Sequence, residues 1–429
     1  MNADAMMEIL EKALRLSTAE VTVAALRGGT NASTRFAENV ITQSVQKTEY
    51  QLSVECAYGQ KHGAAATSNL SEEAIKSVVQ RADAAAKASP PDPEYMPPVG
   101  KDESGKYAKV EAYDARTAQT EPRERAQAVR KAVDRAVAGK MRISGLLAME
   151  DEFHALGNSV GLRAIHSSTN AYCHVTALGD NGSGWAHQCS HRMGDIDLQA
   201  TAERSLGIAR QAQNPTDIEP GRYTVILRPA AVQEFVPYYV ICDAKATDEG
   251  RTCLRGKLGQ KVCGENITLR SDPSDPRCPR TPFRQDGLAS PTLNWIGKGV
   301  LKNLATSRFW AKKTGRQATG YPANVIMDGG SATDEEMIAS TERGIFVVRF
   351  WYIRTVDPME SLLTGMTRDG LFLIENGKIT RPLKQLRFND TVLGVLSRVE
   401  QIGQLERVEN MLMPTIKVRE FHFTSTTKF

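Results

Sequence analysis

The chain has 429 residues and a formal net charge of +4, with 41% hydrophobic and 24% charged residues. This composition is ordinary for a soluble globular protein, and the length allows roughly three domains. The small net charge argues against a dedicated nucleic-acid-binding protein, because such proteins usually carry a strongly basic domain or stripe. We therefore expect a multidomain globular protein with no nucleic acid among its partners.

The first 16 residues predict an amphipathic helix, in which Asp4 and Glu8 are spaced among Met6 and Leu10. A secretory signal would instead begin with basic residues and continue into an apolar run. No stretch of about 18 apolar residues occurs, so no membrane span is expected. The seven cysteines are scattered and odd in number, which indicates reduced thiols rather than a disulfide framework. These features predict a cytoplasmic location.

Residues 1–100 are predicted to form an α/β segment. The pair Gly28-Gly29, with Thr30-Asn31, predicts a turn after the first strand. Ser71 is a candidate N-cap for a helix that ends near Ala88. A proline-rich stretch at 90–98 is the clearest linker and marks the end of this segment. Strands are predicted at 20–26, at 50–58, where the residues alternate with period two, and at 62–68 after a turn at 59–61.

Residues 101–216 are predicted to form a second, central α/β segment. Buried positions three or four apart predict a helix over 121–138 that ends at Gly139, and a further helix covers 198–213. The turn Asp180-Asn181-Gly182-Ser183 separates the last two strands of the segment. Strand patterns cover 142–150, 162–168, 171–178 and 184–191.

Residues 217–429 are richer in strand patterns and predict the largest domain. Asn376-Gly377 is the preferred pair for a type I′ hairpin turn. The overall expectation is an α/β (α+β) protein, with an α/β N-terminal part followed by a larger β-rich C-terminal domain. Strands are expected at 223–227, 346–353, 371–375 and 415–424.

One stretch, residues 308–316, combines basic and aromatic side chains. We interpret it as the end of an amphipathic helix, with cations favoured by the C-terminal dipole and Gly315 as the stop. Contact with nucleic acid is the alternative that this pattern leaves open.

The strand residues His187, Cys189 and His191 form the strongest candidate metal cluster in the sequence. On a strand their side chains point to one face, and Cys173 and His174 are expected on the partner strand. Zinc ligands in known motifs usually lie on turns or helices, which this spacing does not match. A polar strand face is therefore the preferred interpretation, and zinc binding is the alternative.

Three other motifs suggest hydrolytic chemistry but have simpler explanations. Gly157-Asn158-Ser159-Val160-Gly161 matches a nucleophile elbow, but a strand rather than a helix is predicted to follow it. Asp334-Glu335-Glu336 after Thr333 fits the first turn of a capped helix. Cys253 and Cys263 have no histidine nearby in sequence to activate them.

An ordered set of strings, spread over nearly the whole chain, resembles the TldD/PmbA family, which has also been labelled "modulator of DNA gyrase". No single string is decisive, but their order along the chain is strong evidence. The strings include Thr34-Arg35-Phe36-Ala37-Glu38-Asn39, Thr67-Ser68-Asn69-Leu70-Ser71-Glu72-Glu73, Thr281-Pro282-Phe283-Arg284-Gln285-Asp286-Gly287, Gly299-Val300-Leu301-Lys302-Asn303-Leu304, Ala318-Thr319-Gly320, and Leu373-Ile374-Glu375-Asn376-Gly377-Lys378-Ile379.

The resemblance implies a family with two kinds of subunit. TldD-type members carry a His-Glu-x-x-x-His helix and a later cysteine as zinc ligands. PmbA-type members, also called TldE, lack these residues and pair with a TldD-type subunit. The assembled peptidase is expected to take unfolded peptides in extended form into a closed chamber.

Carried onto this chain, the family's metal positions hold no zinc ligand set. The first histidine falls on Gln233, the glutamate on Glu234 and the second histidine on Tyr238. No cysteine follows Cys278, so the third ligand is missing as well. Catalytic zinc usually needs three protein ligands. We therefore expect no catalytic residue, metal or other cofactor in this chain, and zinc only in a partner subunit.

The sequence thus predicts the non-catalytic, metal-free subunit of a TldD/TldE-type heterodimeric metallopeptidase that acts on peptides. Its expected partners are a zinc-bearing TldD-type subunit and an extended peptide, which it would help select by offering strand edges. Two alternatives stay open. One is a stand-alone homodimer that uses the chamber for non-metal chemistry or ligand binding, and the other is a peptide-binding module without an enzymatic partner.

Overall fold

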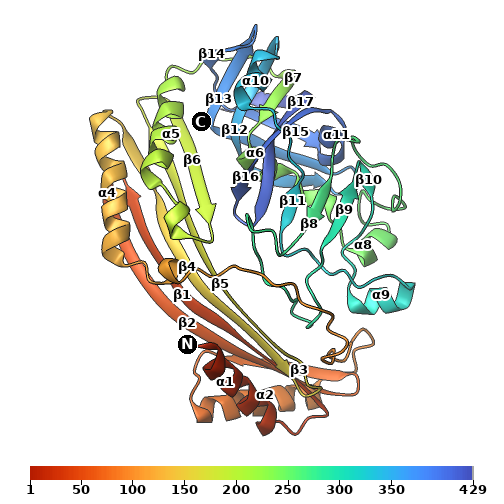
Figure 1. Cartoon of the computed structure of the whole chain (residues 1–429). Coiled ribbons are helices and arrows are strands. Elements are labelled where there is room, and N and C mark those ends of the chain that lie inside the picture. The colour runs from red at the N-terminus through yellow and green to blue at the C-terminus, as the bar shows by residue number, and fades with distance from the viewer. Residues whose placement is uncertain (428–429) are drawn as a thin grey trace.

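Two β-sheets organise residues 1–427, which are the residues that this computed structural model describes. A long curved sheet lies on one side, and the C-terminal domain, built on the second sheet, lies on its concave side (Figure 1). The predicted fold class, an α/β N-terminal part followed by a larger β-rich domain, is confirmed.

The N-terminal sheet has six antiparallel strands in the order β3-β2-β1-β4-β5-β6. Strands from residues 1–100 and from 101–216 therefore join in one sheet, since β1 pairs with β4 along most of its length. The strands are β1 (Val21–Ala37), β2 (Val40–Tyr58), β3 (Lys61–Thr67), β4 (Arg142–Asn158), β5 (Arg163–Leu178) and β6 (Ser183–Ser190).

The predicted turn at Gly28-Gly29 is wrong, because β1 continues through both glycines between β2 and β4. Their φ angles are +150° and +154°. A Cβ on Gly28 would lie 2.1 Å from the carbonyl oxygen of Glu49, and one on Gly29 would lie 1.8 Å from that of Asp151. The glycines therefore allow close approach of neighbouring backbones. The chain turns later, at Glu38 and Asn39, which both have positive φ.

Two predicted strands, at 162–168 and 171–178, form the single strand β5. Thr169 and Asn170 interrupt the sequence pattern, but they pair in register with Asp151 and Glu150 of β4. The alternation of apolar and polar residues along β5 breaks here because the inner face of the sheet is polar in its middle. The usual pattern of one apolar and one polar face therefore does not apply there.

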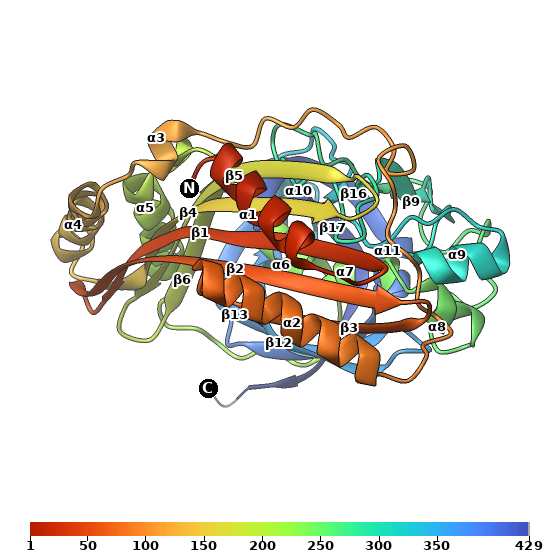
Figure 2. The same ribbon diagram turned by 90° about the horizontal axis from the view of Figure 1, so that it is seen from below.

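The outer face of the six-stranded sheet is covered by helices at both ends. Figure 2 shows α1 and α2 lying across one end, where Leu26 and Val54 of the sheet join Leu10 and Val78 of the helices in one buried cluster. At the other end α4 and α5 pack on β4 and β5. The helices of this part are α1 (Ala3–Leu16), α2 (Glu72–Ala88), α3 (Ala115–Ala118), α4 (Pro122–Ala138), a 3-10 turn (Met193–Asp195) and α5 (Leu198–Gln211).

The predicted helix ends in this part are confirmed. Ser71 caps α2 by accepting a hydrogen bond from the backbone N–H of Ala74. Gly139 follows the last residue of α4. None of the helices in the described part of the chain has the length and hydropathy that crossing a membrane requires.

The C-terminal sheet closes on itself through β7, β12, β13, β15 and β17, since β17 pairs with β15 on one side and with β7 on the other. Apolar residues from all five strands share one large buried cluster. The strands are β7 (Gly221–Leu227), β8 (Leu269–Ser271), β9 (Leu293–Gly297), β10 (Val300–Leu301), β11 (Val325–Met327), β12 (Arg343–Asp357), β13 (Leu362–Glu375), β14 (Lys378–Pro382), β15 (Leu386–Thr391), β16 (Val399–Val408) and β17 (Met411–Thr426).

Short helices complete the C-terminal domain. The predicted type I′ turn is confirmed, with positive φ at Asn376 and Gly377 between β13 and β14. Gly315 ends α9 in the left-handed conformation, as predicted. The helices are α6 (Pro229–Phe235), α7 (Pro237–Val240), α8 (Ala244–Asp248), α9 (Arg308–Thr314), α10 (Asp334–Ala339) and α11 (Val392–Ser397).

The close approach at Gly29 predicts that Gly29→Ala lowers the free energy of unfolding by roughly 2–4 kcal/mol, because the new methyl group meets the Asp151 carbonyl. Gly194→Ala is the matched control, since its methyl group would meet nothing within 4 Å. Urea denaturation of both variants measures the difference. Equal losses in the two would contradict this account of β1.

Candidate functional site

Two cavities lie between the inner face of the six-stranded sheet and the C-terminal domain. The larger, of about 1160 Å³, is lined by His154, His166 and residues of the 280–323 segment, and we call it the histidine cavity. The smaller, of about 880 Å³, is lined by Gln233, Glu234 and strand residues of both domains, and we call it the glutamate cavity. Arg280 lines both cavities, so they are neighbours.

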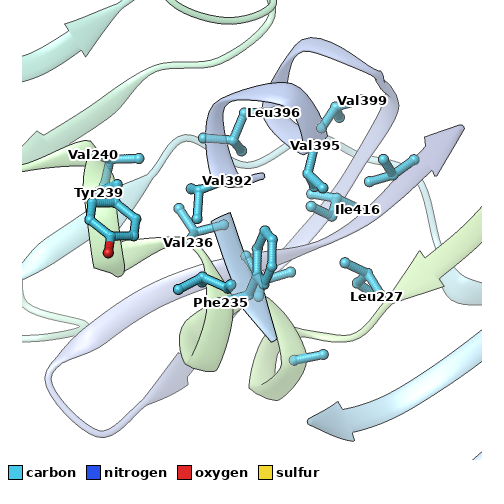
Figure 3. Packing of buried hydrophobic residues seen from close by; sticks show 14 of the residues in the cluster. Leu227, Phe235, Val236, Tyr239, Val240, Val392, Val395, Leu396, Val399 and Ile416 are labelled. Carbon is cyan, nitrogen blue, oxygen red and sulfur yellow. The ribbon is translucent and has the colours of Figure 1, made fainter. Parts of the chain in front are cut away.

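The position of α6 is fixed by its apolar side. Phe235 is fully buried, and its ring lies 5.8 to 6.1 Å from those of Phe350, Phe388 and Phe421. Figure 3 shows Phe235 and Val236 packed in this cluster beside Val392 and Val395 of α11. Because Phe235 is buried inside the closed C-terminal sheet, the preceding Gln233 and Glu234 line the glutamate cavity.

The helix is interrupted after Val236, where α6 ends and α7 begins. Pro237 has no N–H to donate to the preceding turn. Tyr238, at the position of the second motif histidine, lies outside the cavity and is 44% exposed. Its hydroxyl lies 3.5 Å from the carbonyl oxygen of Ile353. The structure therefore brings Gln233 and Glu234 to one cavity and places Tyr238 on the surface.

Gln233 and Glu234 have different surroundings within the cavity. The Gln233 side-chain amide donates to a Glu409 carboxylate oxygen at 3.4 Å. Glu234 Oε1 lies 3.7 Å from an Arg349 guanidinium nitrogen, while its Oε2 is buried and has no hydrogen-bond partner among residues 1–427. Burial raises the pKa of Glu234 to about 7, with Glu409 and Asp369 adding to the rise and Arg349 opposing it.

Arg349 is a central residue that the sequence analysis missed. Its guanidinium carbon lies 4.7 Å from the ring centre of Trp185 in β6 and 5.3 Å from that of Trp351 in β12. Such cation–π contacts hold a guanidinium in place. The Arg349-Phe350-Trp351 run carries a weak signal for it, but Trp185 is distant in sequence. A fixed side-chain cation therefore lies beside the carboxylate at the family's metal position.

The side chains at the family's metal positions do not fit a zinc ion. An amide is a poor zinc ligand and a phenol binds only when deprotonated, and here the Tyr238 hydroxyl lies 3.5 Å from the Ile353 carbonyl oxygen, outside the cavity that Glu234 lines. Within residues 1–427, no group of three or more His, Cys, Asp or Glu side chains is arranged to hold a metal. The absence of metal and catalytic residues stays a prediction, and no metal-dependent step is derived for this chain.

The candidate cluster His187, Cys189 and His191 is only partly brought together. His187 and Cys189 line the glutamate cavity, and both contact the Arg407 carbonyl oxygen at 3.3 Å. His191 lies beyond the end of β6 and accepts a hydrogen bond from the Arg192 guanidinium at 3.1 Å. Burial raises the pKa of Cys189 to about 11 and lowers the pKa of His187. The Cys189 thiol and the His187 imidazole are therefore neutral groups that connect β6 to β16 through the Arg407 carbonyl oxygen.

The two expected neighbours of this cluster separate to opposite faces. His174 pairs with His187 across β5 and β6 and lines the same cavity. Cys173 belongs to the buried cluster under α5, with its thiol 3.6 Å from the Thr201 hydroxyl. The period of two along β5 explains the separation.

The simpler explanations of two of the other motifs, the turn at Ser159 and the capped helix after Thr333, are confirmed. Residues 159–162 form the turn between β4 and β5, where Ser159 Oγ accepts a hydrogen bond from the Thr22 backbone. Thr333 and Glu336 form a capping box at the start of α10. Both cysteines of the third motif are buried. Burial raises the pKa of Cys263 to about 12, whereas the neighbouring Cys242 thiol lowers the pKa of Cys253.

Trp310 of α9 and Arg316, just beyond its end, serve the fold. Trp310 is 8% exposed and donates from its indole nitrogen to Asp248 at 2.7 Å. Arg316 forms an ion pair with the same carboxylate. The expectation that nucleic acid is no partner stays a prediction.

Two family models match the chain, and both describe the same family. Residues 220–425 match the PmbA/TldA metallopeptidase C-terminal domain, and residues 24–86 match domain 1 of the same metallopeptidases. The chain belongs to the TldD/PmbA family. The earlier family resemblance, drawn from short ordered strings, is confirmed.

Similar proteins extend the comparison. The chain is 22% identical to Metalloprotease PmbA of Escherichia coli O157:H7, covering 96% of this chain and 95% of the relative. It is 22% identical to a Methanothermobacter thermautotrophicus metalloprotease over 57% of this chain, and it spans 59% of that relative's length. The crystal structure of TldE from Thermococcus kodakarensis has the same fold, with a TM-score of 0.89, 18% identity, and coverage of 98% of this chain and all of that one.

A Thermotoga maritima protein, proposed to modulate DNA gyrase, shares the fold as well. Its TM-score is 0.87 at 17% identity, with 98% of this chain and 100% of that chain covered. At such identities these structures establish the architecture of the family and leave the activity of this chain to be argued from its own residues.

The raised pKa of Glu234 makes stability depend on pH. Between pH 4.5 and about 7 the folded carboxyl keeps a proton that the unfolded one has lost, so this group lowers the free energy of unfolding as pH rises. Glu234→Gln removes that cost. Relative to the native chain, the free energy of unfolding of the variant should rise by about 1–3 kcal/mol when the pH is raised from 4.5 to 8.

Urea denaturation at both pH values measures this gain. Glu8→Gln is the control, since Glu8 lies on the exposed face of α1, and it should leave the difference between the two pH values unchanged. A stability difference for Glu234→Gln that is the same at both pH values would show that the carboxyl is not desolvated.

Proposed function

We propose that this chain is the non-catalytic, metal-free subunit of a TldD/TldE-type heterodimeric metallopeptidase. In this role it supplies a wall of the peptide chamber and stabilises a zinc-bearing TldD-type partner. Relatives named metalloproteases support a setting in peptide cleavage or maturation. The chain itself contributes binding and architecture, and the cytoplasm is its proposed location.

The observation that carries the proposal is the chemistry of the degenerate metal position. Of the motif residues only Glu234 is a carboxylate, and its neighbour is the Arg349 guanidinium at 3.7 Å. A bound divalent cation would be repelled by this fixed charge. Gln233 is engaged with Glu409, and Tyr238 lies outside the cavity. Zinc chemistry at this position would therefore need a different set of side chains.

Exposed large apolar side chains near the end of β12 support a partner subunit. We call this group the β12 patch: Tyr238, Trp351, Tyr352, Val356 and Met359, each 41–58% exposed. Arginine side chains stack on two of its rings, at 4.2 Å for Arg354 on Tyr352 and 4.5 Å for Arg368 on Trp351. Aromatic and arginine side chains are enriched at protein interfaces, and Trp351 also lines the glutamate cavity.

Reconstitution tests the proposal. The purified chain alone should cleave no unstructured peptide, whereas mixing it with a TldD-type chain that carries an intact His-Glu-x-x-x-His should give cleavage that a chelator abolishes. Light scattering of each sample measures the assembly. Chelator-sensitive cleavage by this chain alone would overturn the proposal, and a stable self-dimer that ignores the TldD-type chain would favour the stand-alone alternative.

Tyr352→Asn tests the β12 patch. Tyr352 has a φ of +56°, which asparagine tolerates, so the variant removes the ring without adding backbone strain. We expect the dissociation constant for the TldD-type chain to rise by roughly tenfold or more, as loss of an interface aromatic can cause. The control Val160→Asn, at a 47% exposed site on the β4–β5 turn, should leave it unchanged. Equal effects of both variants would exclude this patch from the interface.

A further inference from the structure

A row of polar side chains on the inner face of the six-stranded sheet lines one side of the histidine cavity. Arg27 of β1 pairs with His154 of β4, and His154 pairs with His166 of β5. Residues in register on adjacent strands share one face of a sheet. All three line the cavity, so the row is set by strand register and points toward the C-terminal domain.

Several buried polar atoms of this cavity have no partner. The Nε2 atoms of His154 and His166 and the Nε atom of Arg280 are buried and form no hydrogen bond with any of residues 1–427. His166 is only 9% exposed. Burial lowers the pKa of both histidines to about 4, so their imidazoles are neutral near pH 7. Leaving a buried polar atom unpaired is unfavourable, and a ligand with hydrogen-bonding groups would remove that cost.

The cavity also holds guanidinium groups without carboxylate partners. Within the described residues Arg27, Arg280 and Arg308 form no ion pair, although all three line the cavity. The Gln285 amide oxygen, in the orientation that satisfies its neighbours, accepts from Arg27 at 3.1 and 3.3 Å. An amide partner leaves the positive charge of Arg27 uncompensated.

Most acids of the cavity are engaged elsewhere. Asp286 pairs with Arg284, Glu94 with Lys245, and Glu49 with Lys47. Asp243 accepts the N-terminal hydrogen bond of α8. Glu152 is the remaining carboxylate, and burial raises its pKa, an effect that Arg280 opposes. Three unpaired guanidinium groups therefore face one carboxylate, and the balance favours an anionic ligand.

We propose that the histidine cavity binds a carboxylate of an extended peptide, held by Arg27 and Arg280 with the neutral imidazoles of His154 and His166 as further hydrogen-bond partners. Guanidinium groups bind carboxylates through charge-assisted hydrogen bonds. The peptide part of this assignment rests on the proposed function. The carboxylate belongs to the C-terminus of the peptide or to an acidic side chain near it.

The geometry gives the distance from this carboxylate to the glutamate cavity. His166 lines the first cavity and His174 lines the second, on the same face of β5. Eight residues of strand span about 26 Å, and Ser168, Asn170 and Tyr172 lie between them on the inner face as further lining residues. A peptide parallel to β5 thus places a residue about eight positions from its carboxylate beside Glu234 and Arg349.

Fluorescence anisotropy of the full chain, without metal or partner, tests the subsite. Three ten-residue peptides of glycine and serine carry an N-terminal fluorophore. The first ends in a free carboxylate, the second ends in an amide, and the third ends in an amide with glutamate as its last residue. We expect the first to bind roughly tenfold more tightly than the second. Tight binding of the third would assign the site to any carboxylate, and weak binding would assign it to the C-terminus.

Arg27→Gln and Arg280→Gln should each remove the preference for the free carboxylate while leaving the melting temperature unchanged. Arg130→Gln, at an exposed position on α4, is the matched control and should keep the preference. Equal affinity for the first two peptides, no binding of either, or a preference that survives both arginine substitutions would overturn the proposal. None of these outcomes bears on chelator-sensitive cleavage, so the failure of this subsite and of the proposed function are distinguishable.

Discussion

The polar inner face of the six-stranded sheet is the constraint on which the rest of the structure depends. In the middle of this face, alternate residues of β4 and β5 carry imidazole, carboxylate, hydroxyl and amide groups, such as His154, Glu152, Ser168 and Asn170. Apolar side chains of the C-terminal domain cannot close over such a surface without leaving these groups unsatisfied. The two domains therefore enclose two polar cavities instead of one dry core.

The C-terminal domain contributes cavity residues whose positions are fixed by packing inside that domain. Phe235 anchors α6 inside the closed strand ring, and the aromatic cluster around it keeps Glu234 directed at the glutamate cavity. Arg349 is fixed in the same cavity between two tryptophan rings. At the positions where the family resemblance implies zinc ligands, this chain thus holds a carboxylate beside a guanidinium.

Sequence reasoning and structure agree where a local rule decides the outcome. The Ser71 cap, the Gly315 stop and the Asn376-Gly377 turn depend on a few neighbouring residues, and each is found as expected. The expectation that a glycine pair marks a turn is wrong at Gly28-Gly29, because glycines also permit the close approach of neighbouring strands. A second expectation is wrong at Asn170, where a polar residue inside a strand faces a polar cavity instead of ending the strand.

By itself the sequence determined the fold class, several helix ends and turns, and the family to which the chain belongs, and the family resemblance placed Gln233, Glu234 and Tyr238 at the expected metal positions. Only the tertiary structure decided which of those residues meet. His187 and Glu234 looked like rival sites but line one cavity, while Tyr238 leaves it. The row of Arg27, His154 and His166 places Arg27 beside His154, which is more than a hundred positions away in the chain. Strand register across long loops sets such neighbours, and no local pattern encodes it.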